Sequence, residues 1–554
     1  MVEFLLPGMF SSKWLLVYIL VFAFLIRLSG IGYGLPLWVI DDEPPFTLAA
    51  LLMLKLKTVI PAFHLADFSR VLYYPPYLSY LYLIPFGILG LGHYLLFQGG
   101  TAQFADYLTV HIDQFFLIAR FVNILLGAIS VWLAYRISLS LFRDMKTALI
   151  SAFLLATSLV HILFSFTGRH WLPISFVYIL GFYFLCKENW SMEKRYCSAI
   201  VTAGIGMGVS PITALFTPLI ALWYFAYDGK SIKELLVYKK IIFATVLFAG
   251  LAWLPGLLYP RSFGFVGDVT AEQAKTFWGI FSSVFLFLKP VFLSDPAIGI
   301  FAVIGLAFLW RFQKRLALAM IIFLYGYSIV FYELFRFEHR FSLPLIPFLA
   351  ILAGYGIVKL SGYVSEDYRN AAIAVLMLFP LIFAFRFGYL ALKNDSRIAL
   401  RQWIEENIPE GSKIMVSARL MRLASNPVAI AEQRAIDTGS LRSIDIAEER
   451  GFGSQPSYHA FNLYSVSNPV FYENMLEYAQ SNSYQYLVMS DADSWRNPNQ
   501  FAKVSELSQT GTLIRSYGNS QEEYSISIGQ LLGNPLGLFR IDQFGPLVEL
   551  YKLY

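Results

Sequence analysis

The sequence predicts an α-helical membrane protein with about eleven transmembrane helices, followed by an α/β domain outside the membrane. Of the 554 residues, 57% are hydrophobic and 14% are charged, and the mean hydropathy is +0.58. These values lie outside the usual balance of a soluble protein. Aromatic residues make up 17% of the chain, which suits a protein with two membrane interfaces, where rings with a polar edge gather. Long apolar runs fill the first 390 residues, and charge rises from about residue 391.

A helix needs about 20 apolar residues to cross a bilayer about 30 Å thick. Runs that approach this length mark the expected spans. They cover residues 14 to 31, 115 to 141, 146 to 166, 171 to 187, 197 to 210, 212 to 227, 240 to 258, 291 to 310, 316 to 335, 341 to 359 and 371 to 390.

The basic residues predict the orientation of these spans. If the N-terminus is cytoplasmic, most lysine and arginine clusters fall in cytoplasmic loops, as the positive-inside rule requires. Merging the runs 197 to 210 and 212 to 227 into one bent helix would instead place the cluster 311 to 315 outside. We therefore expect a plasma-membrane protein with a cytoplasmic N-terminus and an extracytoplasmic C-terminal domain. The net charge of +5 is spread over many loops, so nothing predicts nucleic-acid binding.

Two extracytoplasmic segments are too long to be simple connections. Residues 1 to 390 form the predicted membrane domain, whose first outer loop covers about 32 to 114. Its apolar stretch 46 to 60 contains two lysines, and we interpret it as a helix lying in the interface. The stretch 77 to 96 is long enough to cross, but proline and glycines interrupt it, and crossing would invert the positive-inside pattern.

The tail from 391 to 554 has the alternating helix and strand signals of a small α/β domain. It opens with a predicted helix that stops near Pro409 and Gly411, and a strand follows. Further strands are expected within 484 to 490, 511 to 517 and 546 to 553. No phosphate loop, metal-spaced cluster or hydrolase motif is evident there.

The acidic cluster Asp41, Asp42 and Glu43 follows the first span and is the strongest candidate for chemistry. Two prolines and an apolar run come next, so one interpretation is a helix cap. A cap needs one carboxylate, however, and three in a row beside lipid raise one another's proton affinity. A general base or a metal ligand would exploit that arrangement. We therefore favour a functional role over capping alone.

Basic residues accompany the acidic cluster on the predicted outer side. Arg169 and His170 lie between the third and fourth spans, and His339 and Arg340 lie between the ninth and tenth. Arginine is suited to two-pronged contacts with phosphate, so the set could hold an anion. The alternatives are an interface anchor or ion pair for Arg340 and an ordinary interfacial histidine for His170. For Arg27 and Arg120, nearer the span interiors, structural pairing is the favoured interpretation. A carboxylate beside a phosphate-binding set predicts a lipid-phosphate substrate whose head group is transferred on this face.

Several segments carry a resemblance to a known family. They are the Asp42-Glu43 pair, Tyr74-Pro75-Pro76, FLIARFVNILLGAISVWLAYRISLSLF, HILFSFTGRHWLPISFVYILGFYFL, FEHRFSLPLIPFLAILAGYG and RQWIEENIPEGSKI. In order and spacing the chain resembles the GT-C membrane glycosyltransferases, in the branch of protein O-mannosyltransferases and lipid A aminoarabinose transferases. The resemblance covers most of residues 14 to 415. Phe166 stands where many relatives have a first arginine, and Tyr74 stands where some have lysine.

The resemblance implies an enzyme that uses a polyprenyl-phosphate sugar as donor. Asp42 would deprotonate the hydroxyl of a protein, lipid or glycan acceptor in a single inverting displacement, with Glu43 in support and Asp41 in a tuning role. Arg169, His170, His339, Arg340 and Tyr74 would contact the donor phosphate. No cofactor is implied with certainty; if a divalent metal ion takes part, Asp42 and Glu43 are its candidate ligands.

Two other functions are compatible with the sequence. A transporter or lipid-sugar flippase would also place ionisable groups at helix ends, although transporters usually contain internal repeats and none is evident. A catalytically silent relative, with the tail as a binding module, is the third possibility. The intact Asp42-Glu43 pair and the large outer segments favour the enzyme.

Overall fold

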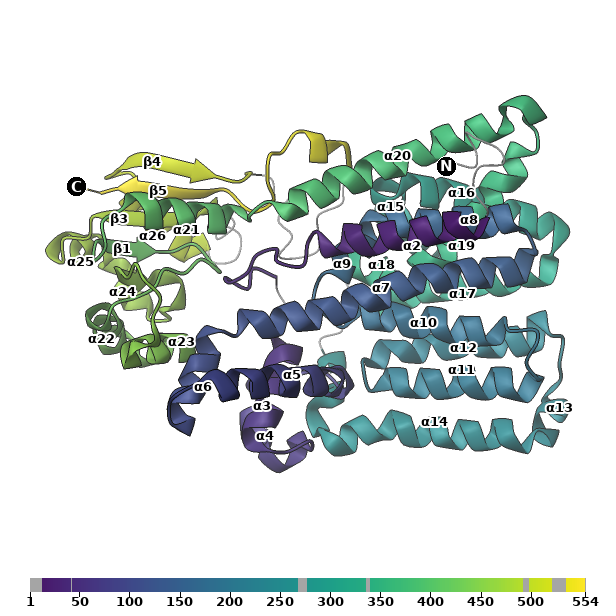
Figure 1. The fold of residues 1–554 in the computed structure, drawn as a ribbon, viewed down its shortest axis with the longest axis horizontal. Coiled ribbons are helices and arrows are strands. Elements are labelled where there is room, and N and C mark those ends of the chain that lie inside the picture. Colours follow the sequence, from purple (N-terminus) through teal and green to yellow (C-terminus); the bar gives the residue numbers. More distant parts are fainter. Residues whose placement is uncertain are drawn as a thin grey trace.

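The computed structural model describes residues 12–40, 42–267, 277–334, 339–491, 498–520 and 535–553. A bundle of roughly antiparallel helices forms one end of the molecule, and a small domain with a sheet forms the other (Figure 1). The bundle contains α2 (Ser12–Leu28), α7 (Asp113–Phe142), α8 (Met145–Thr157), α9 (Leu159–Ser165), α10 (Trp171–Leu185), α11 (Met192–Met207), α12 (Thr217–Leu222), α14 (Lys239–Leu258), α15 (Phe277–Ser294), α16 (Pro296–Phe312), α17 (Lys314–Leu334), α18 (His339–Ser342), α19 (Ile346–Ser361) and α20 (Glu366–Leu392).

The predicted fold class is confirmed, because helices occupy all eleven predicted positions and a sheet follows them. By length and composition, six helices of the described chain could cross a membrane, or up to eight if each bent pair is one span. These apolar helices indicate a multi-pass membrane protein. The run 212 to 227 is a 3-10 turn, α12 and a π turn in succession.

One predicted boundary is wrong. The expected span 291 to 310 begins inside α15, which continues to Ser294, and the chain turns at Asp295 into α16. Pro290 lies inside α15. Apolar helices tolerate an internal proline where neighbouring helices satisfy the freed backbone groups.

Small residues allow α16 and α19 to cross closely. A methyl group at Gly305 of α16 would lie 2.1 Å from the carbonyl oxygen of Leu352, and one at Gly356 of α19 would lie 2.3 Å from the carbonyl oxygen of Phe301. These neighbours are backbone atoms, which cannot move aside as a flexible side chain can. Glycine is therefore needed at this crossing for the helices to approach each other.

We expect Gly305→Leu to destabilise the bundle by about 1–3 kcal/mol or more, the usual cost of overpacking. The melting temperature of the purified protein in detergent measures this effect. Gly326→Ala on the neighbouring helix α17 is the control, because no described atom lies within 4 Å of the added methyl group. Equal melting temperatures for Gly305→Leu and the unaltered protein would contradict the close crossing.

The first outer segment forms α3 (Pro44–Leu56), α4 (Leu65–Phe68), α5 (Tyr77–Leu96) and α6 (Thr101–Val110). Figure 1 shows these helices beside one another where the bundle meets the C-terminal domain. Although α5 is long and apolar enough to cross a membrane, it packs on α3 and α7, with Phe86 in edge-to-face contact with Phe115 near the start of α7. A bend of 82° separates α3 from the helical segment that ends in α4.

The C-terminal domain is built on a five-stranded sheet with the order β2-β1-β3-β5-β4. Its strands are β1 (Lys413–Val416), β2 (His459–Asn462), β3 (Tyr486–Ser490), β4 (Thr512–Tyr517) and β5 (Val548–Lys552), and its main helices are α21 (Ser396–Asn407), α22 (Pro427–Ile436), α23 (Ser443–Ala447), α24 (Pro469–Glu473), α25 (Met475–Ser481) and α26 (Pro498–Ser508). β1 is parallel to β2 and β3, whereas β5 is antiparallel to β3 and β4. Four strands were predicted, and the four-residue β2 was missed.

Polar contacts join this domain to the membrane part. Tyr33, after α2, donates to Asp395 Oδ2 at 2.6 Å, and Arg397 holds both oxygens of the same carboxylate. Arg450 pairs with Asp106 of α6 at 3.0 Å. The C-terminal domain is thereby fixed over the same outer segment that begins with the acidic cluster.

Candidate functional site

The acidic turn lies between α2 and α3, and its two described carboxylates point to different partners. Asp42 has a φ of +60°, in the left-handed region that aspartate adopts more readily than most residues. Glu43 is the residue before the first turn of α3, but its side chain makes no capping hydrogen bond. The capping interpretation therefore does not account for Glu43. Asp41 lies outside the described residues.

Asp42 is held by arginines from two distant parts of the chain. Its Oδ2 lies 2.6 Å from Arg340 Nη1, in α18, and 3.4 Å from Arg169 Nη2, in the turn after α9. Tyr73 donates to Oδ1 at 3.3 Å. The carboxylate side chain remains 24% exposed, so this cluster is accessible from outside. Burial by itself would raise the pKa of Asp42, but the two guanidinium groups outweigh it and lower that pKa.

Glu43 forms a second, fully buried ion pair. Both of its oxygens accept from Arg120 of α7 at 2.7 Å, and neither side chain is exposed. Glu43 Oε1 also accepts from the backbone N–H of Gly168 at 2.6 Å. The remaining Arg120 nitrogen donates to the carbonyls of Ile31 and Tyr33. This pair therefore fastens the acidic turn to α7 and to the turn that carries Arg169.

Asn123 holds the turn after α9 from the other side. Its amide nitrogen donates to the carbonyls of Thr167 at 2.5 Å and Arg169 at 2.8 Å. Asn123 is buried one turn after Arg120 on α7. The sequence analysis missed this residue, although two polar residues three apart in an apolar span are the signal that could have found it.

His170 and Tyr74 lie in an aromatic group beside the ion pair. The His170 ring centroid is 4.3 Å from that of Tyr74 and 5.2 Å from that of Phe46. Burial lowers the pKa of His170 to about 3, so its imidazole is neutral at physiological pH. Burial raises the pKa of Tyr74, and the negative charge of Asp42 raises it further. Tyr74 therefore keeps its proton. Neither residue adds positive charge, but a neutral imidazole or phenol can still donate a hydrogen bond.

Arg340 rests on aromatic rings, with its guanidinium carbon 5.7 Å from the Trp171 ring centroid and 5.4 Å from that of Phe341. Such contacts keep the side chain directed toward Asp42. His339 is in α18, but its side chain lies outside what the structure describes. Of the predicted set, the structure therefore brings together Asp42, Arg169, His170, Arg340 and Tyr74, with Glu43 behind them.

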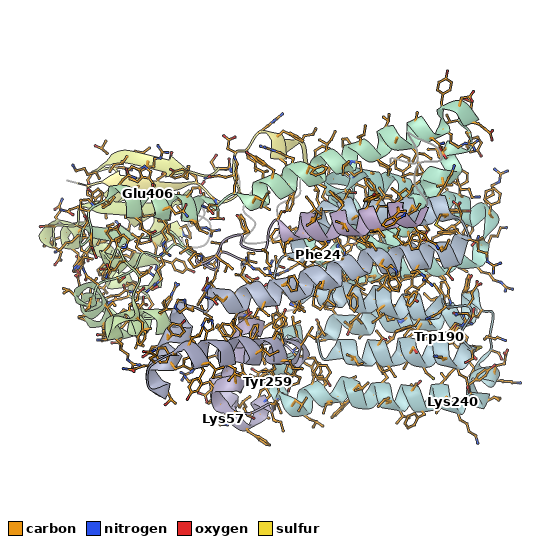
Figure 2. All side chains as sticks on the ribbon, viewed as in Figure 1. Phe24, Lys57, Trp190, Lys240, Tyr259 and Glu406 are labelled. Atoms are coloured by element: carbon orange, nitrogen blue, oxygen red, sulfur yellow. The ribbon has the colours of Figure 1, made fainter. Side chains whose placement is uncertain are left out.

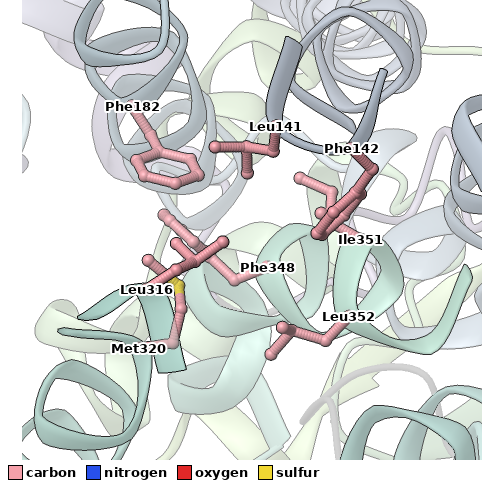
Figure 3. Close-up of a pocket in the computed structure, with 8 residues that line it drawn as sticks. All are labelled: Leu141, Phe142, Phe182, Leu316, Met320, Phe348, Ile351 and Leu352. Atoms are coloured by element: carbon pink, nitrogen blue, oxygen red, sulfur yellow. The ribbon is translucent and has the colours of Figure 1, made fainter. Parts of the chain in front are cut away.

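No preformed metal centre is found in the described part of the chain, where no three His, Cys, Asp or Glu residues are grouped. Glu43 is engaged by Arg120 and Gly168. A small apolar cavity of about 10 Å³ lies elsewhere, between α7, α10, α17 and α19. Figure 3 shows its lining as apolar side chains, Met320 among them, and such side chains cannot activate a hydroxyl or bind phosphate.

The fold and the site together define a multi-pass helical membrane protein with an accessible carboxylate and two arginines where the bundle meets its C-terminal domain. No family model matches the chain. No curated protein matches it either.

Solved structures of glycosyltransferases are similar to this chain. ArnT from Cupriavidus metallidurans bound to undecaprenyl phosphate is 11% identical, with a TM-score of 0.49 and 98% of each chain covered. The apo form of that protein is 14% identical, with a TM-score of 0.46, 71% of this chain and 72% of that chain covered. Arabinofuranosyltransferase AftD from Mycobacteria is 13% identical, with a TM-score of 0.42, 98% of this chain and 40% of that chain covered. At these values the likeness assigns no substrate or residue role.

Proposed function

We propose that this protein is a membrane glycosyltransferase that moves a sugar from a polyprenyl-phosphate donor to an acceptor hydroxyl on the extracytoplasmic face. The single observation that carries the proposal is the contact of Asp42 with both Arg169 and Arg340. Two guanidinium groups share one carboxylate, and arginine suits phosphate. The same few atoms thus supply a base and an anion-binding site.

The two arginines link donor binding to base activation. A donor phosphodiester carries negative charge and competes with Asp42 for Arg169 and Arg340. As these guanidinium groups turn to the phosphate, Asp42 loses the contacts that lower its pKa, and it becomes a stronger base. The resting ion pair therefore keeps Asp42 ionised but weakly basic until the donor is present.

The reaction is a single displacement. The acceptor oxygen attacks the anomeric carbon, the bond from that carbon to the phosphate oxygen breaks, and its electron pair goes to the phosphate. Asp42 takes the acceptor proton, a step worth about 10²- to 10⁴-fold. Arg169 and Arg340 neutralise the charge that develops on the leaving phosphate. His170 and Tyr74, as neutral groups, donate hydrogen bonds to the same phosphate. Attack opposite the leaving group inverts the anomeric centre.

Glu43 is a positioning residue in this mechanism. It aligns the turn containing Arg169 with the turn containing Asp42 through its contacts with Arg120 and Gly168. The tail from 391 to 554 covers the same outer segment and is suited to bind the acceptor, which is a protein, a lipid or a glycan.

We place the site on the extracytoplasmic side. Figure 2 shows Trp190 and Lys240 at the end of the bundle opposite the C-terminal domain. Lys187 and Lys194 lie over the Trp190 ring at 4.1 Å each. Clustered lysines with an interfacial tryptophan favour the cytoplasmic side for that end, and the site lies at the other end.

Transport without covalent transfer is disfavoured by the break between α8 and α9. In transporters the ends of broken helices bind the substrate or coupling ion. Here side chains of the protein occupy the two ends of the broken helix instead. Arg27 donates to the carbonyls of Leu155 and Ala156, and Asp295 accepts from the N–H of Leu159. Uptake by proteoliposomes without any covalent product would instead support a transporter.

We expect Arg340→Ala to raise the KM for the donor about 10- to 100-fold, the effect of one charge-assisted hydrogen bond, with little change in the acceptor KM. Loss of this guanidinium also raises the pKa of Asp42, so the acidic limb of the kcat/KM profile should move to higher pH. Initial rates over a pH series with a radiolabelled polyprenyl-phosphate sugar measure both effects.

Arg70→Ala is the matched control, because Arg70 is an exposed arginine of the same outer segment. It should change neither the donor KM nor the pH profile. An unchanged donor KM in Arg340→Ala, or an equal rise for donor and acceptor, would contradict the phosphate-binding role.

A further inference from the structure

The third predicted span is not one helix. α8 ends at Thr157 and α9 begins at Leu159, and the two axes differ by 59°. Breaking a membrane helix exposes carbonyls on one side and N–H groups on the other, each costly in apolar surroundings unless a partner is supplied. The sequence here, ATSLVH, contains no proline or glycine. Ser158 itself caps α9 by accepting from His161 N at 3.3 Å, and the other exposed groups need partners from elsewhere in the chain.

Arg27 of α2 satisfies the carbonyl side. Its guanidinium is fully buried and donates to Leu155 O at 3.0 Å and Ala156 O at 3.2 Å, at the end of α8. It also contacts α9, through His161 Nδ1 at 2.9 Å and Ser165 Oγ at 3.2 Å. One side chain thus holds both halves of the broken span.

Asp295, between α15 and α16, satisfies the N–H side. Its carboxylate accepts from Leu159 N at 2.8 Å, from Val160 N at 3.4 Å and from Ser158 Oγ at 2.7 Å. Asp295 is 7% exposed, and every one of these donors belongs to the first turn of α9 or the residue before it. Its contacts therefore set the direction in which α9 leaves the break.

The direction of α9 matters because Arg169 and His170 lie in the turn that follows it. At 1.5 Å per residue, the seven residues of α9 extend about 10 Å, so a bend of 59° displaces their far end by about 10 Å relative to a straight continuation. Gly127 of α7 leaves room for this course, since a methyl group there would lie 2.5 Å from Ser165 Oγ and 3.2 Å from Arg27 Cδ.

We propose that Arg27 and Asp295 are positioning residues that hold the broken helix α8–α9 so that Arg169 and His170 meet Asp42 and the donor phosphate. The inference rests on the proposed function for its kinetic consequence, but its structural part does not. Both residues are far from the reacting atoms in sequence, and they act through α9 rather than on the substrate.

The test compares two aspartates that cap the two halves of the same span. Asp295→Asn removes charge and acceptor capacity at the start of α9. Asp144→Asn does the same at the start of α8, where Asp144 accepts from Lys146 N and Thr147 N, at the end of the span away from the site. We expect Asp295→Asn to raise the donor KM about tenfold or more, as misplacement by an ångström can do, without changing the acceptor KM. Asp144→Asn should change neither.

Two further readouts are independent of sugar transfer. Hydrogen exchange should become faster at the amides of residues 159 to 168 in Asp295→Asn and remain unchanged at 145 to 157. Binding of undecaprenyl phosphate should weaken about tenfold in the same variant. Ser158→Ala, which removes one contact of Asp295 together with the cap to His161 N, provides a second variant should Asp295→Asn not fold, and we expect an effect in the same direction.

The positioning role would be overturned if Asp295→Asn and Asp144→Asn raised the donor KM equally. It would also be overturned if hydrogen exchange became faster throughout both α8 and α9, because that result indicates a general loss of stability. If the unaltered protein transfers no sugar, the proposed function fails, whereas the exchange and lipid-binding measurements still decide the role of Asp295.

Discussion

Asp42→Asn is expected to reduce glycosyl transfer by at least about 10²-fold while the protein still folds and inserts. An amide cannot take the acceptor proton, and general-base catalysis contributes about 10²- to 10⁴-fold. The amide is also neutral, so it competes less than the carboxylate does with phosphate for Arg169 and Arg340. We therefore expect undecaprenyl phosphate to bind Asp42→Asn at least as tightly as it binds the unaltered protein.

Two measurements on the same purified variant separate these effects. Transfer from a radiolabelled polyprenyl-phosphate sugar reports the base, and titration with undecaprenyl phosphate reports the anion site. Asp67→Asn is the control, because Asp67 is an exposed carboxylate of the same outer segment. Unchanged transfer by Asp42→Asn would exclude Asp42 as the base, and loss of lipid binding would show that the carboxylate only supports the arginines.

The largest effect on stability is expected at the buried pair Glu43 and Arg120. Glu43→Gln leaves the Arg120 guanidinium buried without a countercharge, which typically costs about 3–5 kcal/mol. It also weakens the contact with Gly168, so the turn containing Arg169 should become less ordered. Thermal unfolding in detergent should show a large fall in melting temperature, together with reduced transfer.

A double-variant series tests whether the two residues act as a pair. Glu43→Gln combined with Arg120→Met removes both charges, so it should destabilise less than the sum of the single variants. The exposed pair of Arg143 and Glu188, whose side chains are 79% and 55% exposed, is the matched control. Exposed ion pairs contribute little, so Arg143→Ala should have a much smaller effect. Additive losses at Glu43 and Arg120 would contradict direct coupling.

Much of the site could be predicted because charge is rare in an apolar chain. Asp42, Arg169 and Arg340 stand out at the ends of predicted spans, and the positive-inside rule placed all three on one face. Their meeting could not be derived from spacing, since Arg340 and Asp42 are 298 residues apart. Only the packing of α9 and α18 around the acidic turn brings them within 2.6 and 3.4 Å of one carboxylate.

The division of roles between neighbouring residues also depended on packing. Asp42 and Glu43 are equivalent in the sequence, and both were candidate bases or metal ligands. The left-handed backbone at Asp42 turns one carboxylate to the accessible side, and α7 presents Arg120 to the other. A pattern of residue types contains no information about which of two adjacent side chains faces a helix and which faces solvent.

The sequence by itself determined the membrane class, the positions of the helices and most strands, because bilayer thickness and strand patterning act on consecutive residues. The tertiary structure alone decided the break at Ser158, the course of α9 and the meeting of Asp42 with its arginines. These features depend on hydrogen bonds that Arg27 and Arg120 donate and that Asp295 accepts, and all three residues lie on other parts of the chain. Contacts between residues distant in the chain stabilise these features, and local residue preferences do not reveal which distant residues will meet.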